Sequence, residues 1–592
     1  MALTKIQIKT GLNRENTNYA GEGGYYSCDK IRFRSGYAEK IGGWITNSVN
    51  TFAGVCRSIF NWVSLNSENL FAVGTNQRYY IQNNGTFYPI TPIVRTLTLA
   101  NNPFTTVAGT TTVTVVDAGF ASTVGSFVNF TGATPVGGLT IAGSYEIVTA
   151  GVGTYKIYAP GATSGATAGG AAVVASYELS AGSSIYAALT NAGWGVSNWG
   201  NGGWGTSTGS SISIALWSQS NWGQDLVFGI RNGDLYYWVN NTVADAYGNY
   251  SPAVSMHTYA DTVLPAANVY KTTTTAAVAQ APAINPTIIV ANTLDIDPGA
   301  LIYGTNIDAG TYVSTAWTGS TSVPLIGAVT AFTAGILLGA TLKFSYAGKT
   351  SPNQINQVVV FSTYQFVVTL GSTPYDPTNF TPAFNPMLVR WSDQTKAYEW
   401  TPSTFNQSGE QILSNGSYIV AGATARQELL IWTDKALYAM QYVGAPFVFS
   451  FTTLMDNISI MSPNAMITVN NITYWMGVDK FYIYDGTVQP LPCTIRQYVL
   501  HNINFSQSFQ VICGHNEEYS EVWWHYPSTD SNTNDSYAVW NYADSNWYFG
   551  TMNRTAWYDT PITPNPIAAI SVQNSYLTAA LTSTDTTIPV IS

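Results

Sequence analysis

A short unit of aromatic and β-branched runs recurs along this chain and constrains its fold more than any other feature. The clearest copy lies between residues 472 and 550, where runs such as Ile472–Met476 and Glu521–Tyr526 alternate with Asp, Asn, Gly and Ser. Such runs are typical of antiparallel strands joined by tight turns. Comparable groups of runs occupy residues 55–92, 213–239, 358–400, 418–442, 466–486 and 511–550. About four strands repeated about six times, with one Tyr/Trp-rich strand per unit, predict an all-β protein with a roughly six-bladed β-propeller.

Two stretches between these units have a different composition. Residues 93–180 and 262–350 are rich in Gly, Ala and Thr and contain short β-prone runs such as Thr111–Val116 and Thr341–Phe344. Loops of this length without structure are improbable in a compact domain. We therefore predict two inserted small β modules. The expected organisation is an N-terminal strand or docking segment (1–54), a first blade (55–92), an inserted module (93–180), a Gly-Trp segment with a second blade (181–261), a second module (262–350), the remaining blades (351–560) and a C-terminal segment (561–592).

The charge content is low. Charged residues make up 9% of the chain, compared with about 25% in ordinary proteins, and aromatic residues make up 14%. A surface that is polar but hardly charged suits a subunit packed into an assembly, although it also fits a Thr/Asn-rich all-β protein with no such role. The net charge of −10 argues against gripping nucleic acid by neutralising phosphates.

The cysteines and the apolar runs bear on where the chain is made. Four cysteines, scattered and without a CxxC pair, fit a reduced protein made in a cytoplasm. The first residues alternate as a strand does, and no apolar run approaches the length of a membrane span. We therefore expect neither a signal peptide nor integral membrane association.

Two groups of residues are candidates for an interface. In the first, Ile31 and Phe33 alternate with basic residues, and Ser35-Gly36 supplies a turn. The basic face is either solvated or a docking edge for an acidic neighbour. In the second, three Trp residues lie in a Gly-rich run, where leaving them in water would be costly, so we expect packing against a blade or a neighbouring subunit. The candidates are Lys30, Arg32, Arg34, Lys40, Trp194, Trp199 and Trp204.

Motifs for covalent chemistry are nearly absent. Gly348-Lys349-Thr350 lacks the earlier glycine of a phosphate-binding loop, and there is no HExxH, GxSxG or Cys/His metal spacing. One cluster, His515, Glu517, Glu518, Glu521 and His525, is either a structural hairpin with its turn at 517–520 or a metal or acid/base site. We favour the hairpin, and we predict no catalytic residue, no cofactor and no metal.

Three segments carry a resemblance to a known family. They are residues 21–26 with Ile31–Trp44, the Gly-Trp run Ala192–Gly205, and Val511–Pro527 continuing through 534–542 and 547–557. In this order they resemble the tail nozzle proteins of short-tailed bacteriophages, also called packaged-DNA stabilisation or tail tube proteins.

The resemblance implies a structural virion protein, assembled in the host cytoplasm into the phage tail. Such proteins form a ring, usually of six subunits, below the portal and adaptor, and contact tail fibre or needle proteins. The ring retains packaged double-stranded DNA and conducts it without sequence-specific binding. We predict a polar or acidic channel wall, because Lys and Arg would bind moving DNA. The alternative is a glycan-binding propeller or a glycosidase, although the Ser-x-Asp-x-Gly-x-Thr-Trp turns of sialidase-type propellers are absent.

Overall fold

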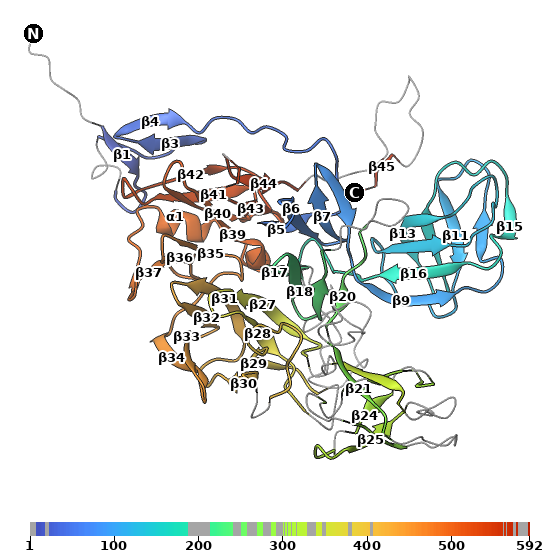
Figure 1. Ribbon diagram of the computed structural model, residues 1–592. Helices are drawn as coiled ribbons and strands as arrows, with labels where there is room; N and C mark the ends of the chain where they lie inside the picture. Colours follow the sequence, from blue (N-terminus) through green and yellow to red (C-terminus); the bar gives the residue numbers. More distant parts are fainter. Residues whose placement is uncertain are drawn as a thin grey trace, which may run out of the picture.

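The six repeat units are six separate sheets in the computed structural model (Figure 1). The structure describes residues 8–17, 23–186, 214–240, 250–256, 269–275, 286–291, 296, 300, 302–304, 306–308, 311–314, 317–327, 339–345, 351–376, 382–402, 406–559, 562–563, 565–571, 576–577 and 590–591. Each of the six sheets has four antiparallel strands that follow one another in chain order. This is the strand order of propeller blades.

The blades are numbered along the chain. Blade one is β5 (Cys56–Val63), β6 (Asn69–Thr75), β7 (Tyr79–Asn83) and β8 (Thr86–Pro89). Blade two is β17 (Trp217–Trp222), β18 (Asp225–Ile230), β19 (Leu235–Trp238) and β20 (Val254–Ser255). Blade three is β27 (Ile355–Phe361), β28 (Phe366–Ser372), β29 (Asn385–Trp391) and β30 (Gly409–Ile412). Blade four is β31 (Ile419–Ala425), β32 (Glu428–Thr433), β33 (Ala436–Gly444) and β34 (Val448–Asp456). Blade five is β35 (Met466–Val469), β36 (Ile472–Met476), β37 (Phe481–Tyr484) and β38 (Val488–Pro490). Blade six is β39 (Ile512–Asn516), β40 (Glu521–Tyr526), β41 (Ser536–Asn541) and β42 (Asn546–Thr551).

A seventh, smaller sheet closes the ring. The first strand of each blade contacts the first strand of the next, from β5 through β17, β27, β31 and β35 to β39. The gap between blades six and one is filled by the two-stranded sheet of β43 (Ala556–Tyr558) and β44 (Ile567–Ala569). Strand β43 contacts both β39 and β5. The sequence predicted the six four-stranded blades but not this seventh sheet, whose strands are only three residues long.

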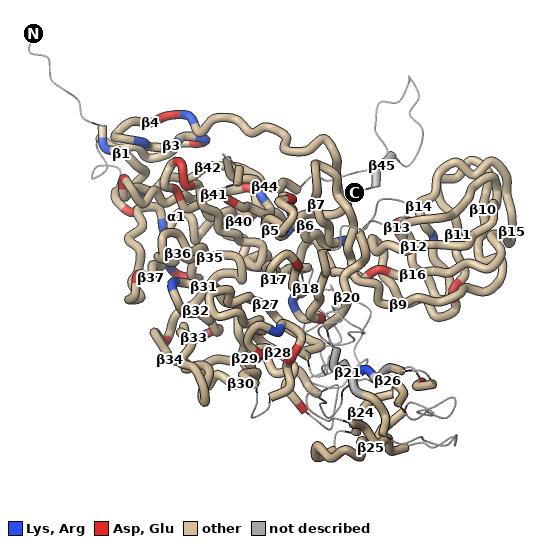
Figure 2. Tube along the Cα trace, in the orientation of Figure 1, with Lys and Arg blue, Asp and Glu red and all other residues tan. Residues whose placement is uncertain are grey.

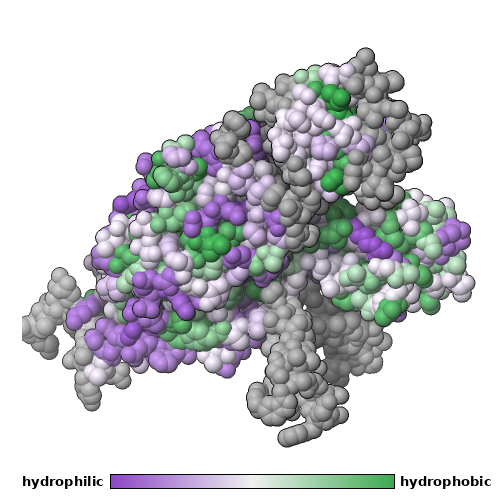
Figure 3. Space-filling model, turned by 90° about the horizontal axis from the view of Figure 1, so that it is seen from below, coloured by the Kyte–Doolittle hydropathy of each residue, from purple (hydrophilic) through white to green (hydrophobic). Residues whose placement is uncertain are grey.

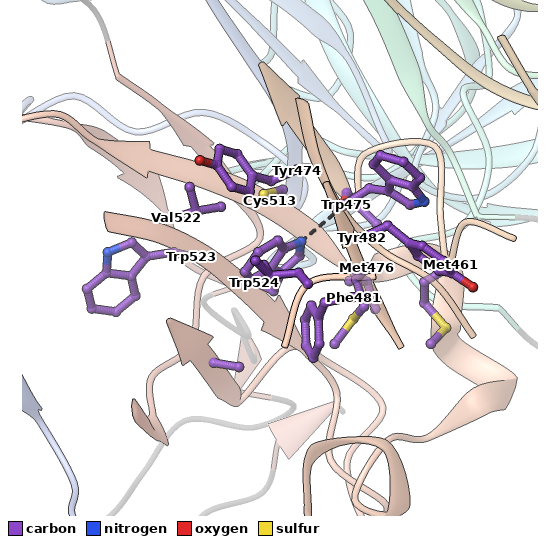
Figure 4. Close-up of a cluster of buried hydrophobic side chains, with 14 of the residues drawn as sticks. Met461, Tyr474, Trp475, Met476, Phe481, Tyr482, Cys513, Val522, Trp523 and Trp524 are labelled. Atoms are coloured by element: carbon purple, nitrogen blue, oxygen red, sulfur yellow. Dashed lines mark hydrogen bonds between the residues drawn. The ribbon is translucent and has the colours of Figure 1, made fainter. Parts of the chain in front are cut away.

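Turn residues and alternation explain why these segments form blades. Asn84-Gly85 and Asn470-Asn471 join adjacent strands with positive φ at both positions, the turn geometry that matches strand twist. Along β40, neighbouring side chains point to opposite faces. Trp524 enters an aromatic cluster with Phe481, whereas Trp523 points away from it (Figure 4). Buried aromatic residues therefore join consecutive blades.

The two inserted stretches form sheets with cores of their own. Residues 93–180 give one eight-stranded antiparallel sheet of β9 (Ile93–Thr98), β10 (Phe104–Thr106), β11 (Thr112–Val116), β12 (Phe127–Thr131), β13 (Gly143–Ala150), β14 (Thr154–Tyr158), β15 (Ala166–Gly169) and β16 (Val174–Glu178). Residues 262–350 give two three-stranded sheets of β21 (Val269–Thr273), β22 (Thr287–Ile289), β23 (Ile302–Tyr303), β24 (Tyr312–Val313), β25 (Ser322–Ile326) and β26 (Thr341–Ser345). Each stretch has a separate apolar cluster. Both project from the propeller (Figure 1).

Some predicted strands differ from those observed. Ala397–Trp400 is a turn rather than a strand, because its residues fold back so that the Trp400 indole donates to the Ala397 carbonyl at 2.9 Å. The fourth strand of blade three is β30 instead, and β34 in blade four was not predicted. A short helix α1 (Arg496–His501) and a 3-10 helix (Phe505–Gln510) connect blades five and six. Near the C-terminus, β45 (Tyr576–Leu577) pairs with β46 (Val590–Ile591).

Residues 9–17 and 23–52, the N-terminal arm, lie along blade six and then cross to blade one (Figure 1). Strand β1 (Lys9–Leu12) pairs with β2 (Gly24–Tyr25), and β3 (Ile31–Arg34) forms a hairpin with β4 (Tyr37–Lys40). Ser35 and Gly36 have positive φ, which confirms the predicted turn. Both β1 and β3 contact β42, the outer strand of blade six. The N-terminal arm therefore packs against the last blade of the propeller.

Candidate functional site

The first strands of the blades surround a cavity on the propeller axis. Its volume is about 440 Å³, and β5, β17, β27, β31, β35, β39 and β43 all contribute to its wall. The wall is lined by polar and apolar groups. Arg57 is its one charged residue among the described residues, and none of these is Asp or Glu. Glycoside hydrolysis uses a pair of carboxyl groups in most families, and the described wall of this cavity supplies none.

Two glutamines connect neighbouring blades at the cavity wall. The Gln219 Oε1 atom accepts hydrogen bonds from Ser58 Oγ at 3.0 Å and from the Tyr79 hydroxyl at 2.6 Å, joining blades two and one. Gln357 exchanges two hydrogen bonds with the Gly422 backbone, at 2.9 and 2.7 Å, joining blades three and four. The amide groups of these two glutamines thus hold neighbouring blades together through hydrogen bonds.

Arg57 lies where the cavity meets the connection between blades five and six. Its Nη2 atom donates to the Ser184 carbonyl at 2.6 Å and to Gln510 Oε1 at 2.9 Å. Gln507, in the same 3-10 helix, exchanges hydrogen bonds of 3.0 and 2.7 Å with the Tyr186 backbone. Burial lowers the pKa of Arg57 to about 10, so its guanidinium stays charged at neutral pH. The 3-10 helix and residue 184 thus hold the side chain of Arg57 at the cavity wall.

The seventh sector, which we define as the space between blades six and one with β43, β44 and the N-terminal arm, contains a buried ion pair. Arg32 is 4% exposed, and its Nε and Nη2 atoms donate to the two Glu521 oxygens at 2.8 and 3.0 Å. Glu521 is 0% exposed and also accepts from Trp523 Nε1, at 2.9 Å, and from the Tyr548 hydroxyl. Burial opposes ionisation of Arg32, but the attraction of Glu521 outweighs it and raises the Arg32 pKa.

Further side-chain contacts of the arm continue from this ion pair across the sector. Trp44 of the arm meets Trp557 of β43 with ring centroids 5.3 Å apart. The guanidinium carbon of Arg554 lies 4.2 Å from the centre of the Trp44 ring. Further along, the arm reaches blade one, where Phe52 packs on Phe87 at 5.0 Å. The arm therefore spans from the last blade to the first, over the two-stranded sheet.

The predicted interface residues fall into three groups. Arg32 is directed at Glu521 of its own chain, which differs from the prediction that it shares an outward face with Lys30 and Arg34. The reason is that Arg32 and its neighbour Phe33 are both buried, Arg32 beside Tyr519 and Glu521 and Phe33 beside Tyr25 and Tyr548. Lys30, Arg34 and Lys40 are exposed, and Figure 2 shows the arm's basic residues close together. Trp194, Trp199 and Trp204 lie outside the described residues.

The histidine and glutamate cluster is a hairpin. His515 lies on β39 and His525 on β40, with the turn at 517–520 between them, as predicted. Glu521 is committed to Arg32, and His525 is stacked against Trp557 with centroids 5.4 Å apart. Within the described part of the chain, no group of three His, Cys, Asp or Glu side chains is placed to hold a metal ion. All four cysteines are free thiols.

No described helix is long and apolar enough to cross a membrane. On the face seen from below, apolar residues form small patches among polar ones (Figure 3). No family model matches the sequence, and no curated protein matches it.

Two solved structures illustrate what the chain is similar to. Phage phi92 endosialidase is 10% identical over 90% of this chain and 78% of its own, with a TM-score of 0.14. The extracellular domain of a hybrid two component system from B. thetaiotaomicron is 11% identical over 88% of this chain and 80% of its own, with a TM-score of 0.22. Scores this low give no information about function.

Proposed function

We propose that this chain is a structural subunit of a phage tail nozzle, a ring of identical copies that retains packaged double-stranded DNA and conducts it during ejection. The observation that carries the proposal is the contact between two of the segments that resemble nozzle proteins. Residues 31–44 and 511–557 pack on each other in the seventh sector, through Arg32 with Glu521 and Trp44 with Trp557. The residues of these two segments, which resemble those of nozzle proteins, are therefore among those that close the propeller.

In this proposal the DNA passes between copies and not through one propeller. An axial cavity of about 440 Å³ has the size of a small-ligand pocket, and duplex DNA, whose major groove alone is about 12 Å wide, does not fit it. The channel wall would then come from the outer surfaces of several subunits. With a net charge of −10, such a wall would repel phosphates and leave the DNA free to move.

The role we propose is mechanical and includes no bond cleavage. The partners would be further copies of this chain in the ring, together with portal and adaptor proteins above and fibre or needle proteins below. Exposed Lys30, Arg34 and Lys40 on the arm remain the proposed contact with such a partner. Arg32 is not part of this exposed group, because its guanidinium is buried against Glu521.

Negative-stain electron microscopy and native mass measurement of the purified full chain test the proposal. We expect a ring with a central hole and a mass that is a whole multiple of the 63.8 kDa subunit. A protein that stays monomeric at high concentration and binds glycans on an array would overturn the nozzle proposal in favour of a glycan-binding propeller. Release of sugar from a glycan substrate would overturn the non-enzymatic role.

A further inference from the structure

The N-terminal hairpin is a separate unit attached to blade six by side chains. Strands β3 and β4 pair with each other and with no other described strand. They are attached through side chains. Phe33 is buried against Tyr548, Arg32 is paired with Glu521, and the Lys30 and Ser35 amides donate to the Tyr537 hydroxyl at 3.1 Å and to Asp544 at 2.9 Å. A unit bound in this way can leave its site without breaking a sheet.

Every blade six needs such a hairpin, because Glu521 is fully buried. Without Arg32, its carboxylate would be a buried charge with no compensating partner, which is strongly unfavourable. However, Glu521 can be paired with an arginine from any copy of the chain. An arm from a neighbouring copy would make the same contacts as the chain's own arm.

The part of the arm between β4 and blade one has the properties of a hinge with an uncovered apolar surface. Residues 41–52 form no described strand. Ile45 is 92% exposed and Val49 is 95% exposed, and Tyr37 in the hairpin is 78% exposed. A subunit beside the seventh sector would cover these side chains and gain the free energy of burying them.

We propose that in the assembled ring the N-terminal arm is exchanged, so that the arm of one copy docks in the seventh sector of the next. This inference rests on the proposed ring. The occupant is a second copy of this chain, and the contact is head-to-tail, as closed rings of identical subunits require. Exchange of an identical element is a low-cost route to oligomers, because the contacts made are those already present in one chain. Residues 45–49, which span at most about 17 Å when extended, would cross between neighbouring propellers.

Site-directed crosslinking tests the exchange. Asp29 in the arm and Thr551 in blade six approach within 3.2 Å through Asp29 Oδ1 and Thr551 Oγ1. Two full-length chains would be co-expressed with different affinity tags, one carrying D29C and the other T551C, both with Cys28 and Cys493 replaced by Ser. A short bis-maleimide is then added. Because each chain holds only one new thiol of the pair, a covalent dimer carrying both tags forms only when an arm lies on another copy.

We expect the two-tag dimer in the assembled ring, and its loss when R32M is added to the D29C chain. The double variant D29C/T551C, in a single chain, supplies the matched control, and exchange predicts that it gives crosslinked species up to the whole ring. A ring in which the double variant crosslinks only within each chain would overturn the exchange while leaving the proposed function intact. A protein that remains monomeric would overturn both.

Discussion

The two faces of blade six differ in how they are joined to the rest of the molecule. Toward blade five, Trp524 and Trp547 pack on Phe481 with ring centroids 4.9 and 4.7 Å away. Toward the seventh sector, the same sheet presents Glu521, which is paired with Arg32 of the arm. Blade five is thus joined to blade six by aromatic contacts, whereas the arm, which arrives from the other end of the chain, adds a buried ion pair to its aromatic contacts.

The comparison extends to another joint. Arg78 of blade one donates its Nε to Glu178 of the first inserted module at 2.7 Å, and both side chains are buried. Apolar faces tolerate many partners, but a buried charge is satisfied only by its complement, so a wrong docking carries a large penalty. We interpret both ion pairs as selecting the correct partner where several similar sheet faces are available.

The largest loss of stability is expected from a substitution between blades five and six, where the contacts are apolar. Phe481→Ala should lower the free energy of unfolding by about 3–5 kcal/mol, because it leaves a cavity between blades five and six. Guanidinium chloride unfolding followed by Trp fluorescence measures it. The control is Phe447→Ala at a position that is mostly exposed, where a change within about 0.5 kcal/mol is expected. Equal losses in both variants would contradict the role given to this face.

The ion pair should show a smaller loss that a second substitution partly reverses. Arg32→Met should cost about 3 kcal/mol, because it leaves Glu521 buried without its partner. Arg32→Met combined with Glu521→Leu should recover part of this, since no buried charge then remains, although Trp523 and Tyr548 lose their acceptor. The exposed neighbour serves as a control, and Arg34→Met should leave unfolding unchanged. If the double variant were as unstable as the sum of its singles, the two residues would not be coupled.

The effect that is smallest near neutral pH is a pH dependence that arises at the seventh-sector face of blade six. Burial, together with the charge of Arg554, lowers the pKa of His525 to about 3. His525 is therefore protonated near pH 6.5 in the unfolded chain but stays neutral in the folded protein. The free energy of unfolding then falls by about 1.4 kcal/mol per pH unit below that pH. With His525→Phe, the free energy of unfolding should depend less steeply on pH between pH 4 and 6, by the amount that corresponds to the uptake of about one proton. At pH 8 the two proteins differ only by packing, and an unchanged acid limb would refute this assignment.

Local sequence patterns predicted much of the fold but little of the seventh sector. Aromatic runs and turn residues located the six blades, and alternation around Ser35-Gly36 located the β3–β4 hairpin. The turn at 517–520 followed from the position of its flanking runs. The pattern of β3 could not show which basic residue is buried, because alternating basic residues look the same whether water or a carboxylate faces them.

The sequence by itself determined the strands, their turns and the low charge of the surface, since these depend on residues close together in the chain. Only the tertiary structure decided that Arg32 meets Glu521, 489 positions away, and that a two-stranded sheet and the arm share the last sector. Strand propensity acts over a few residues. Ring closure depends on how many sheets fit around an axis and on which distant side chains complement one another there.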